Sequence, residues 1–235
     1  MKHSIICRSI ALVITLILVF NLSLSINAKY YHDNSGNVYV HKKTDKKLVA
    51  LTFDDGPHNI KTDNILRVLE KYNVKATFFV IGENAQKYPD VLKRVQAGGH
   101  EIGNHTYDHK SIYKLSGEAV ADEVNKCTQA IESITGQSPN LFRPPEGFMN
   151  DTLADIVGKH GYNVILWKVD TYDWMGKSAK EIFATVTKNV KNGDIILMHD
   201  YIWRKSNTAD ALDMIIPYMQ EAGFQFCTVS ELISE

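Results

Sequence analysis

Short, mostly apolar segments alternate with amphipathic helical patterns from Leu48 onward, and this alternation limits the possible folds more than any other feature. The segments read LVALTF, ATFFVI, HEIGN, LFR, VILWKV, DIILMH and FQFCTV, and each has the length of one strand. Strands that are apolar on both faces and alternate with helices predict a parallel sheet covered by helices, either open and doubly wound or closed as a barrel. The helical patterns cover residues 59–72, 84–96, 117–134, 151–160, 178–190 and 208–221.

Residues 48–235 contain no linker, low-complexity tract or repeat, so the sequence predicts one α/β domain there. A chain of 235 residues can bury a sizeable core without disulfides. Cys127 and Cys227 could form a disulfide, but lone buried thiols are the commoner case, so we expect no essential disulfide. The formal net charge of -1 argues against a polyanion-binding surface, so we expect no nucleic acid partner.

The first 28 residues differ from the rest of the chain. A basic start precedes the apolar run IALVITLILVF, and NLSLSINA follows it, ending in the small residue Ala28. This pattern predicts a signal peptide, with a retained membrane anchor as the alternative, because residues 10–26 could span a bilayer if cleavage failed. We expect a secreted or cell-surface protein that meets the membrane only through an uncleaved N-terminal segment. Residues 29–47 are expected to form a peripheral hairpin or extended arm.

Polar residues gather where the predicted strands end, and the loops at the carboxyl ends of parallel strands converge on one face. The clearest case is LTFDDGPH, in which a buried strand ends in Asp54 and Asp55. Neighbouring carboxylates repel each other and a turn needs only one of them, so the pair predicts a metal or a basic side chain nearby. A turn cap formed together with Gly56 and Pro57 is the alternative.

Two histidines in HTYDH suggest the metal. His105 and His109 are four residues apart, and we interpret the segment as one helical turn that directs both imidazoles to one point. Such a pair alone is more often structural. With Asp54 or Asp55 nearby, however, two histidines and one aspartate would leave a coordination position open, which is typical of catalytic zinc. The other aspartate would then serve as general base.

Two further residues follow apolar strands. Arg143 precedes two prolines that stiffen its loop, and we predict that it pairs with the base aspartate and keeps it ionised; an ordinary surface arginine is the alternative. His199 could act as general acid if a carboxylate keeps it cationic, and Asp173 is the candidate. A satisfied core histidine is the alternative for His199.

Taken in order, TFDDGP, HTYDH, RPPEG, DTYDW and LMH resemble the five motifs of the polysaccharide deacetylases, carbohydrate esterase family 4, which share the nodulation-type chitooligosaccharide deacetylase domain. The resemblance runs from about Leu48 to Leu232. It implies a distorted (β/α) barrel of about seven parallel strands forming a single catalytic domain over residues 48–235. It also implies hydrolysis of N-acetyl groups on an aminosugar polymer with one divalent metal, zinc first, with cobalt, nickel or manganese as alternatives.

The resemblance implies roles for the residues of the first three motifs. Asp54 would be the catalytic base, held by Arg143. The metal ligands would be Asp55, His105 and His109.

The resemblance also implies that residues of RPPEG, DTYDW and LMH contact the leaving amine and the acetyl group. The resemblance implies that His199, oriented by Asp173, protonates the leaving amine. A backbone N–H at Glu146 would stabilise the oxyanion, and Trp174 and Leu197 would wall the pocket for the acetyl methyl. Glu146 itself departs from the family, which usually has tyrosine at this position; its carboxylate could repel acidic polymers or recognise a cationic, partly deacetylated sugar.

The substrate is less constrained than the reaction. Peptidoglycan, through N-acetylglucosamine or N-acetylmuramic acid, ranks first because an exported enzyme meets the wall. Chitooligosaccharide ranks second and acetylated xylan third. A non-catalytic sugar-binding relative and a hydrolase of small amides remain alternatives, and we expect a monomer. Aromatic residues that could stack on sugar rings, or belong to the core, are Tyr107, Phe148, Tyr172, Tyr201 and Trp203.

Overall fold

The structure is a computed structural model that describes residues 37–235, so the predicted signal peptide or anchor at residues 1–28 lies outside the described residues. Within residues 37–235, no helix is long and apolar enough to cross a membrane. The strands of this part of the chain are β1 (Val38–Tyr39), β2 (Leu48–Asp54), β3 (Thr77–Val80), β4 (Glu101–Asn104), β5 (Leu141–Phe142), β6 (Asn163–Ile165), β7 (Val169–Asp170), β8 (Ile195–His199) and β9 (Gln225–Cys227).

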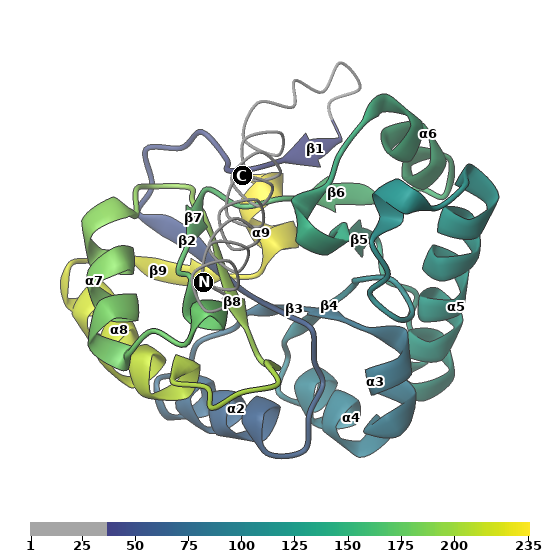
Figure 1. The fold of residues 1–235 in the computed structure, drawn as a ribbon. Helices are drawn as coiled ribbons and strands as arrows, with labels where there is room; N and C mark the ends of the chain where they lie inside the picture. The colour runs from purple at the N-terminus through teal and green to yellow at the C-terminus, as the bar shows by residue number, and fades with distance from the viewer. Residues whose placement is uncertain (1–36) are drawn as a thin grey trace, which may run out of the picture.

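Most of the helices form a layer around the outside of the sheet, whereas α9 lies on its inner side, where Val229 and Leu232 pack with Ala50 (Figure 1). Their bounds are α2 (Lys61–Lys71), α3 (Gly82–Lys87), α4 (Pro89–Ala97), α5 (Gly117–Thr135), α6 (Asp151–Lys159), α7 (Ala179–Asn189), α8 (Thr208–Glu221) and α9 (Val229–Ser234).

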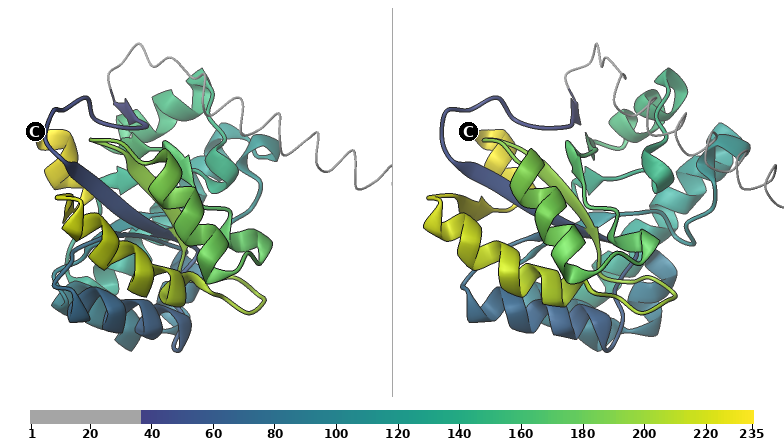
Figure 2. Two further views of the ribbon diagram at one scale, coloured as in Figure 1. Left: turned by 90° about the vertical axis from the view of Figure 1, so that its left-hand side faces the viewer. Right: turned by 60° about the vertical axis from the view of Figure 1, so that its left-hand side comes forward.

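The strands form one curled sheet with the order β1-β6-β5-β4-β3-β2-β8-β7, and β9 pairs with β2. Every pair of these strands is parallel. In a flat sheet of this order, β6 and β7 would lie six strand spacings apart, about 29 Å. Residues 166–168 alone connect them, and such a link reaches at most about 14 Å. The sheet must therefore curl into the predicted distorted barrel (Figure 2).

The prediction of one strand over VILWKV is wrong. Its first part is β6, which pairs with β5 and β1, whereas its last part is β7, which pairs with β8 at the other end of the sheet. The backbone changes partner between them, because Leu166 N–H donates to Tyr39 O and Lys168 N–H donates to Ile195 O. This apolar run is the seam at which the barrel closes.

Two other boundaries also differ from the sequence prediction. The single helix expected over residues 84–96 is broken into α3 and α4 at Tyr88, which has non-helical φ and ψ because Pro89 follows it. The strand expected over 224–229 is shortened to β9, because Thr228 instead caps α9 in a capping box with Glu231.

Of the hairpin or extended arm predicted over residues 29–47, residues 29–36 lie outside the described residues, and residues 37–47 run along the sheet. β1 adds to β6 in parallel register, and His41 forms an antiparallel bridge with Asp194. Lys42 N–H donates to Gly193 O at 2.9 Å. Gly193 has a φ of +80°, and a Cβ there would lie 1.7 Å from Lys42 O, so the approach of the arm requires glycine.

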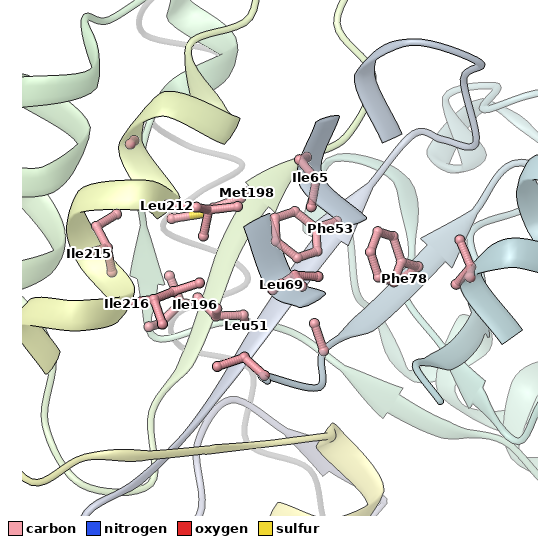
Figure 3. Packing of buried hydrophobic residues seen from close by; sticks show 14 of the residues in the cluster. Leu51, Phe53, Ile65, Leu69, Phe78, Ile196, Met198, Leu212, Ile215 and Ile216 are labelled. Atoms are coloured by element: carbon pink, nitrogen blue, oxygen red, sulfur yellow. The ribbon is translucent and has the colours of Figure 1, made fainter. Parts of the chain in front are cut away.

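Alternation along β2 decides what faces the interior of the barrel. Leu51 and Phe53 point outward and pack against Ile65 and Leu69 of α2 and against α8 (Figure 3). Each such fully buried side chain contributes about 1.5–3 kcal/mol to stability. Ala50 faces the opposite side and packs with the buried residues that α9 covers. By the same two-residue period, Thr52 and Asp54 face the interior at the carboxyl end of the strand.

Candidate metal centre and active site

Asp55, His105 and His109 each place one possible ligand atom within 4.8 Å of the others. Asp55 Oδ1 lies 3.5 Å from Nε2 of His105 and 3.4 Å from Nε2 of His109. Among the described residues, this Oδ1 is the buried side-chain polar atom that has no hydrogen-bond partner. One carboxylate and two imidazoles are a donor set that divalent zinc takes, so these residues fit a metal ion.

The segment from His105 to His109 is not the helical turn that its spacing suggested. It is an irregular loop in which Thr106 and His109 have φ values of +68° and +58°. The rings of the two histidines nevertheless lie 5.0 Å apart between centroids. They converge because the loop folds back on itself, so the prediction of a shared site holds whereas its helical explanation is wrong.

The orientation of His105 is set by the neighbouring strand. Its Nδ1 lies 2.7 Å from the backbone oxygen of Arg143, so the tautomer that donates from Nδ1 leaves Nε2 free to face Asp55. Burial alone would raise the pKa of Asp55, but the imidazole of His105 beside it and the charges of His199 and His109 lower that pKa to about 2. Asp55 is therefore ionised and ready to bind a cation.

Asp54 and Arg143 form the predicted ion pair. Arg143 Nη1 donates to Asp54 Oδ1 at 2.7 Å and to Thr52 Oγ1 at 2.8 Å. The guanidinium is fully buried and also donates to the backbone oxygens of Ile165 and Leu166 at the barrel seam. It therefore joins the carboxylate of Asp54 to the closure of the barrel.

His199 and Asp173 form a second pair, in which the Asp173 side chain is fully buried and the His199 side chain is 13% exposed. His199 Nδ1 lies 2.8 Å from Asp173 Oδ1, while Asp173 Oδ2 accepts from His199 N–H and from the Thr208 hydroxyl, each at 2.8 Å. Burial disfavours the charged imidazole, but the carboxylate of Asp173 outweighs this and raises the pKa of His199 to about 10. His199 is therefore a cation at neutral pH, as an acid requires.

These groups meet in a pocket of about 250 Å³ at the carboxyl edge of the sheet. Arg143 and Asp173 lie behind its wall. A larger groove of about 890 Å³ beside α2 and α4 contains none of the predicted site residues. The pocket is lined by Asp54, Asp55, His105, His109, Glu146, Trp167, Asp170, Trp174, Leu197 and His199.

Two lining residues, Trp167 and Asp170, were not assigned from the sequence. Trp167 stands in the seam between β6 and β7, inside a segment predicted to be plain strand. Asp170 accepts from Tyr172 N–H at 2.7 Å, and burial raises its pKa to about 6. The signal for Asp170 was present, because it opens the DTYDW motif at a strand end.

Of the aromatic residues considered for sugar stacking, Tyr172 and Trp203 are exposed, by 41% and 81%. Tyr107 and Phe148 instead pack against core clusters. Tyr201 stacks on His58, with 5.0 Å between ring centroids. Only part of this set is therefore free to meet a sugar.

Residues 41–165 match the family model described as polysaccharide deacetylase, which is more than half of the chain. The chain belongs to the polysaccharide deacetylase family. A peptidoglycan-N-acetylglucosamine deacetylase of Bacillus cereus is 39% identical over 190 residues, which are 80% of this chain and 89% of that protein. The peptidoglycan-N-acetylmuramic acid deacetylase PdaC of Bacillus subtilis is 42% identical over 80% of this chain, but this covers only 39% of PdaC.

Solved structures of the family share the fold. The crystal structure of the peptidoglycan N-acetylglucosamine deacetylase Bc1960 superposes with a TM-score of 0.83 at 34% identity, covering 87% of this chain and 98% of that one. A family 4 pseudoenzyme of Bacillus anthracis, BA3943, superposes at 0.80 with 31% identity, covering 86% of this chain and 70% of that one. The fold therefore accommodates both active and inactive members, and the residues of the pocket must decide between them.

Proposed function

We propose that this family member removes N-acetyl groups from the aminosugars of peptidoglycan, N-acetylglucosamine or N-acetylmuramic acid. One observation carries the proposal: a carboxylate paired with arginine and a histidine paired with aspartate flank a metal-binding trio in one pocket. The names of the similar proteins from Bacillus cereus and Bacillus subtilis support peptidoglycan over chitooligosaccharide and xylan.

Asp55, His105 and His109 would hold one divalent metal ion, and we propose zinc because imidazole nitrogen with a single carboxylate suits it. When bound, the ion would supply Lewis acidity that polarises the acetamide carbonyl and lowers the pKa of a water.

The residues around the trio would move the protons. Asp54, hydrogen-bonded to Arg143, accepts a proton from the attacking water. The backbone N–H of Glu146 donates to the oxygen of the acetamide as negative charge develops there. His199, held as a cation by Asp173, donates its proton to the sugar nitrogen as the C–N bond breaks. Acetate and a free amine leave the pocket.

The walls of the pocket would select the acetyl group. Trp174 and Leu197 line it and would contact the methyl. Glu146 also lines it, with a φ of +59° and its Oε1 3.4 Å from the Ser111 hydroxyl. Its carboxylate would favour sugars next to an amine that has already been freed. The N-terminal segment would export the chain to the cell surface, where a monomer is sufficient.

Acetate release tests this function. The metal-loaded protein lacking residues 1–28 is incubated with peptidoglycan and, separately, with N-acetylglucosamine oligomers. The expected result is release from peptidoglycan that a chelator and the Asp54→Asn variant both abolish. Metal binding without release from either substrate would contradict the proposal and leave a non-catalytic sugar-binding protein or a small-amide hydrolase.

A further inference from the structure

We propose that two buried carboxylates outside the trio, Asp200 and Glu123, are positioning residues that hold the two metal-ligand loops in shape. Asp200 accepts from one backbone N–H group of the loop of Asp55, and Glu123 accepts from two backbone N–H groups of the loop of His109. The proposal rests on the proposed function, because it concerns the metal site of that reaction.

Both loops need such support because the ligands themselves adopt unfavourable backbone conformations. Asp55 has a φ of +77°, and Thr106 and His109 have φ values of +68° and +58°. Residues with a Cβ rarely adopt this left-handed region, and they stay there only where the surrounding structure imposes it. Removing the support should let the loops relax and separate the ligand atoms.

Asp200 holds the loop after β2. Its Oδ1 accepts from Gly56 N–H at 2.9 Å, and its Oδ2 accepts from the Thr62 hydroxyl at 2.6 Å. Thr62 in turn accepts from His58 N–H at 2.8 Å. A Cβ on Gly56 would lie 1.9 Å from Asp200 Oδ2, so glycine is required for this contact directly after Asp55. Asp200 also donates its own N–H to Asp54 O at 3.1 Å.

Glu123 holds the other loop from α5. The residue is only 5% exposed, and its Oε2 accepts from Tyr107 N–H and Asp108 N–H, each at 3.1 Å. Of the three remaining N–H groups, that of His105 donates to Val80 O, that of Thr106 donates to Asn104 Oδ1, and that of His109 donates to Thr106 Oγ1. From Thr106 to His109, side chains therefore accept from every backbone N–H group, while Gly82 and Glu83 donate to the backbone oxygens of Thr106 and Tyr107.

The strand that precedes Asp200 offers a matched control. Asp194, at the amino end of β8, is as buried as Asp200, and its Oδ2 accepts from Lys191 N–H at 2.8 Å. It performs the same kind of backbone capping at the opposite edge of the sheet. A general loss of stability should appear in the variants at both ends of β8, whereas a loss of metal affinity should appear in the Asp200 variant and not in the Asp194 variant.

The test is a zinc titration by calorimetry on Asp200→Ala, Glu123→Ala and Asp194→Ala, with thermal unfolding of each protein in chelator. We expect zinc affinity to fall about 10–100-fold in the first two variants, and the absorption spectrum of bound cobalt to change. The Asp194 variant should lose thermal stability but keep both properties. Affinities and spectra unchanged in the Asp200 and Glu123 variants would overturn the proposal.

Milder variants cover the case in which an alanine variant fails to fold. Asp200→Asn keeps an acceptor for Gly56 N–H and should retain most of the affinity, whereas Thr62→Val removes the hydroxyl and should lose part of it. Equal affinity in these two proteins would contradict the proposal. If the unaltered chain binds zinc tightly but releases no acetate, the proposed function is wrong, and the zinc affinities of the variants still test the positioning roles. If it binds no zinc, both fail.

Discussion

Replacing Arg143 by methionine should cost more stability than any other single change in the site. The guanidinium is fully buried and makes four hydrogen bonds, to Asp54, Thr52 and the backbone oxygens of Ile165 and Leu166. Methionine fills similar space but donates to none of these atoms. The carboxylate of Asp54, which is 3% exposed, loses its counter-charge, and the barrel seam loses two bonds.

Breaking a buried ion pair by removing one partner costs about 3–5 kcal/mol, because the remaining charge is uncompensated. Asp54→Asn should be costly for the same reason, since it leaves the charge of Arg143 buried without a partner. The double variant carries neither charge. We therefore expect it to be less destabilised than the sum of the single variants by about 1–3 kcal/mol.

Urea unfolding of all four proteins in chelator measures this coupling without any contribution from bound metal. Arg143→Lys is the control, because it keeps a charge but loses the planar fork that reaches two carbonyl oxygens. If the two single losses add to within about 0.5 kcal/mol in the double variant, Asp54 and Arg143 are energetically independent and the ion-pair interpretation is wrong.

Three further predictions concern the chemistry. Asp173→Asn removes the anion that raises the pKa of His199 to about 10. The pKa of His199 should fall, so the alkaline limb of the pH–rate profile should move to lower pH. An alkaline limb at the same pH in this variant would contradict the prediction. Zinc at about a thousandfold above its Kd should stabilise the protein by about 4 kcal/mol; thermal unfolding should show this rise in the unaltered chain and not in Asp55→Ala. Glu146→Tyr should lower the preference for partly deacetylated over fully acetylated oligomers in acetate release; an unchanged preference would exclude the charge recognition.

Much of the site was predictable because the sheet follows simple rules. Asp54, Arg143 and His199 stand at the carboxyl ends of β2, β5 and β8, or directly after them, and parallel strands bring those ends together. The two-residue period then selects the side chains that face the interior. Arg143 was expected to pair with the base aspartate, which the family resemblance identified as Asp54, and Asp173 was expected to keep His199 cationic; each of these two pairs is hydrogen-bonded in the structure.

The remaining features depend on contacts between distant parts of the chain. Periodicity could not show that VILWKV changes strand partners after Leu166, because the run is mostly apolar throughout and its partners, β5 and β8, lie more than 20 residues away in the sequence. Trp167 was missed for this reason. The contact of Glu123 with the loop of His109 could not be predicted either, because a charged residue on an amphipathic helix is normally expected to be exposed. Only the folded structure places the loop of His109 against it.

The strands of the sheet carry the two groups that would transfer protons, whereas the loops carry ligands of the proposed metal ion. Asp54 and His199 are register partners on the neighbouring strands β2 and β8. The spacing of paired strands, about 4.8 Å, therefore fixes the separation between the two groups that would move protons. Asp55 and His109 stand instead on irregular loops that Asp200 and Glu123 hold. Changes in the loops should consequently alter metal affinity first, whereas changes at the strand ends should alter the rate while the metal is still bound.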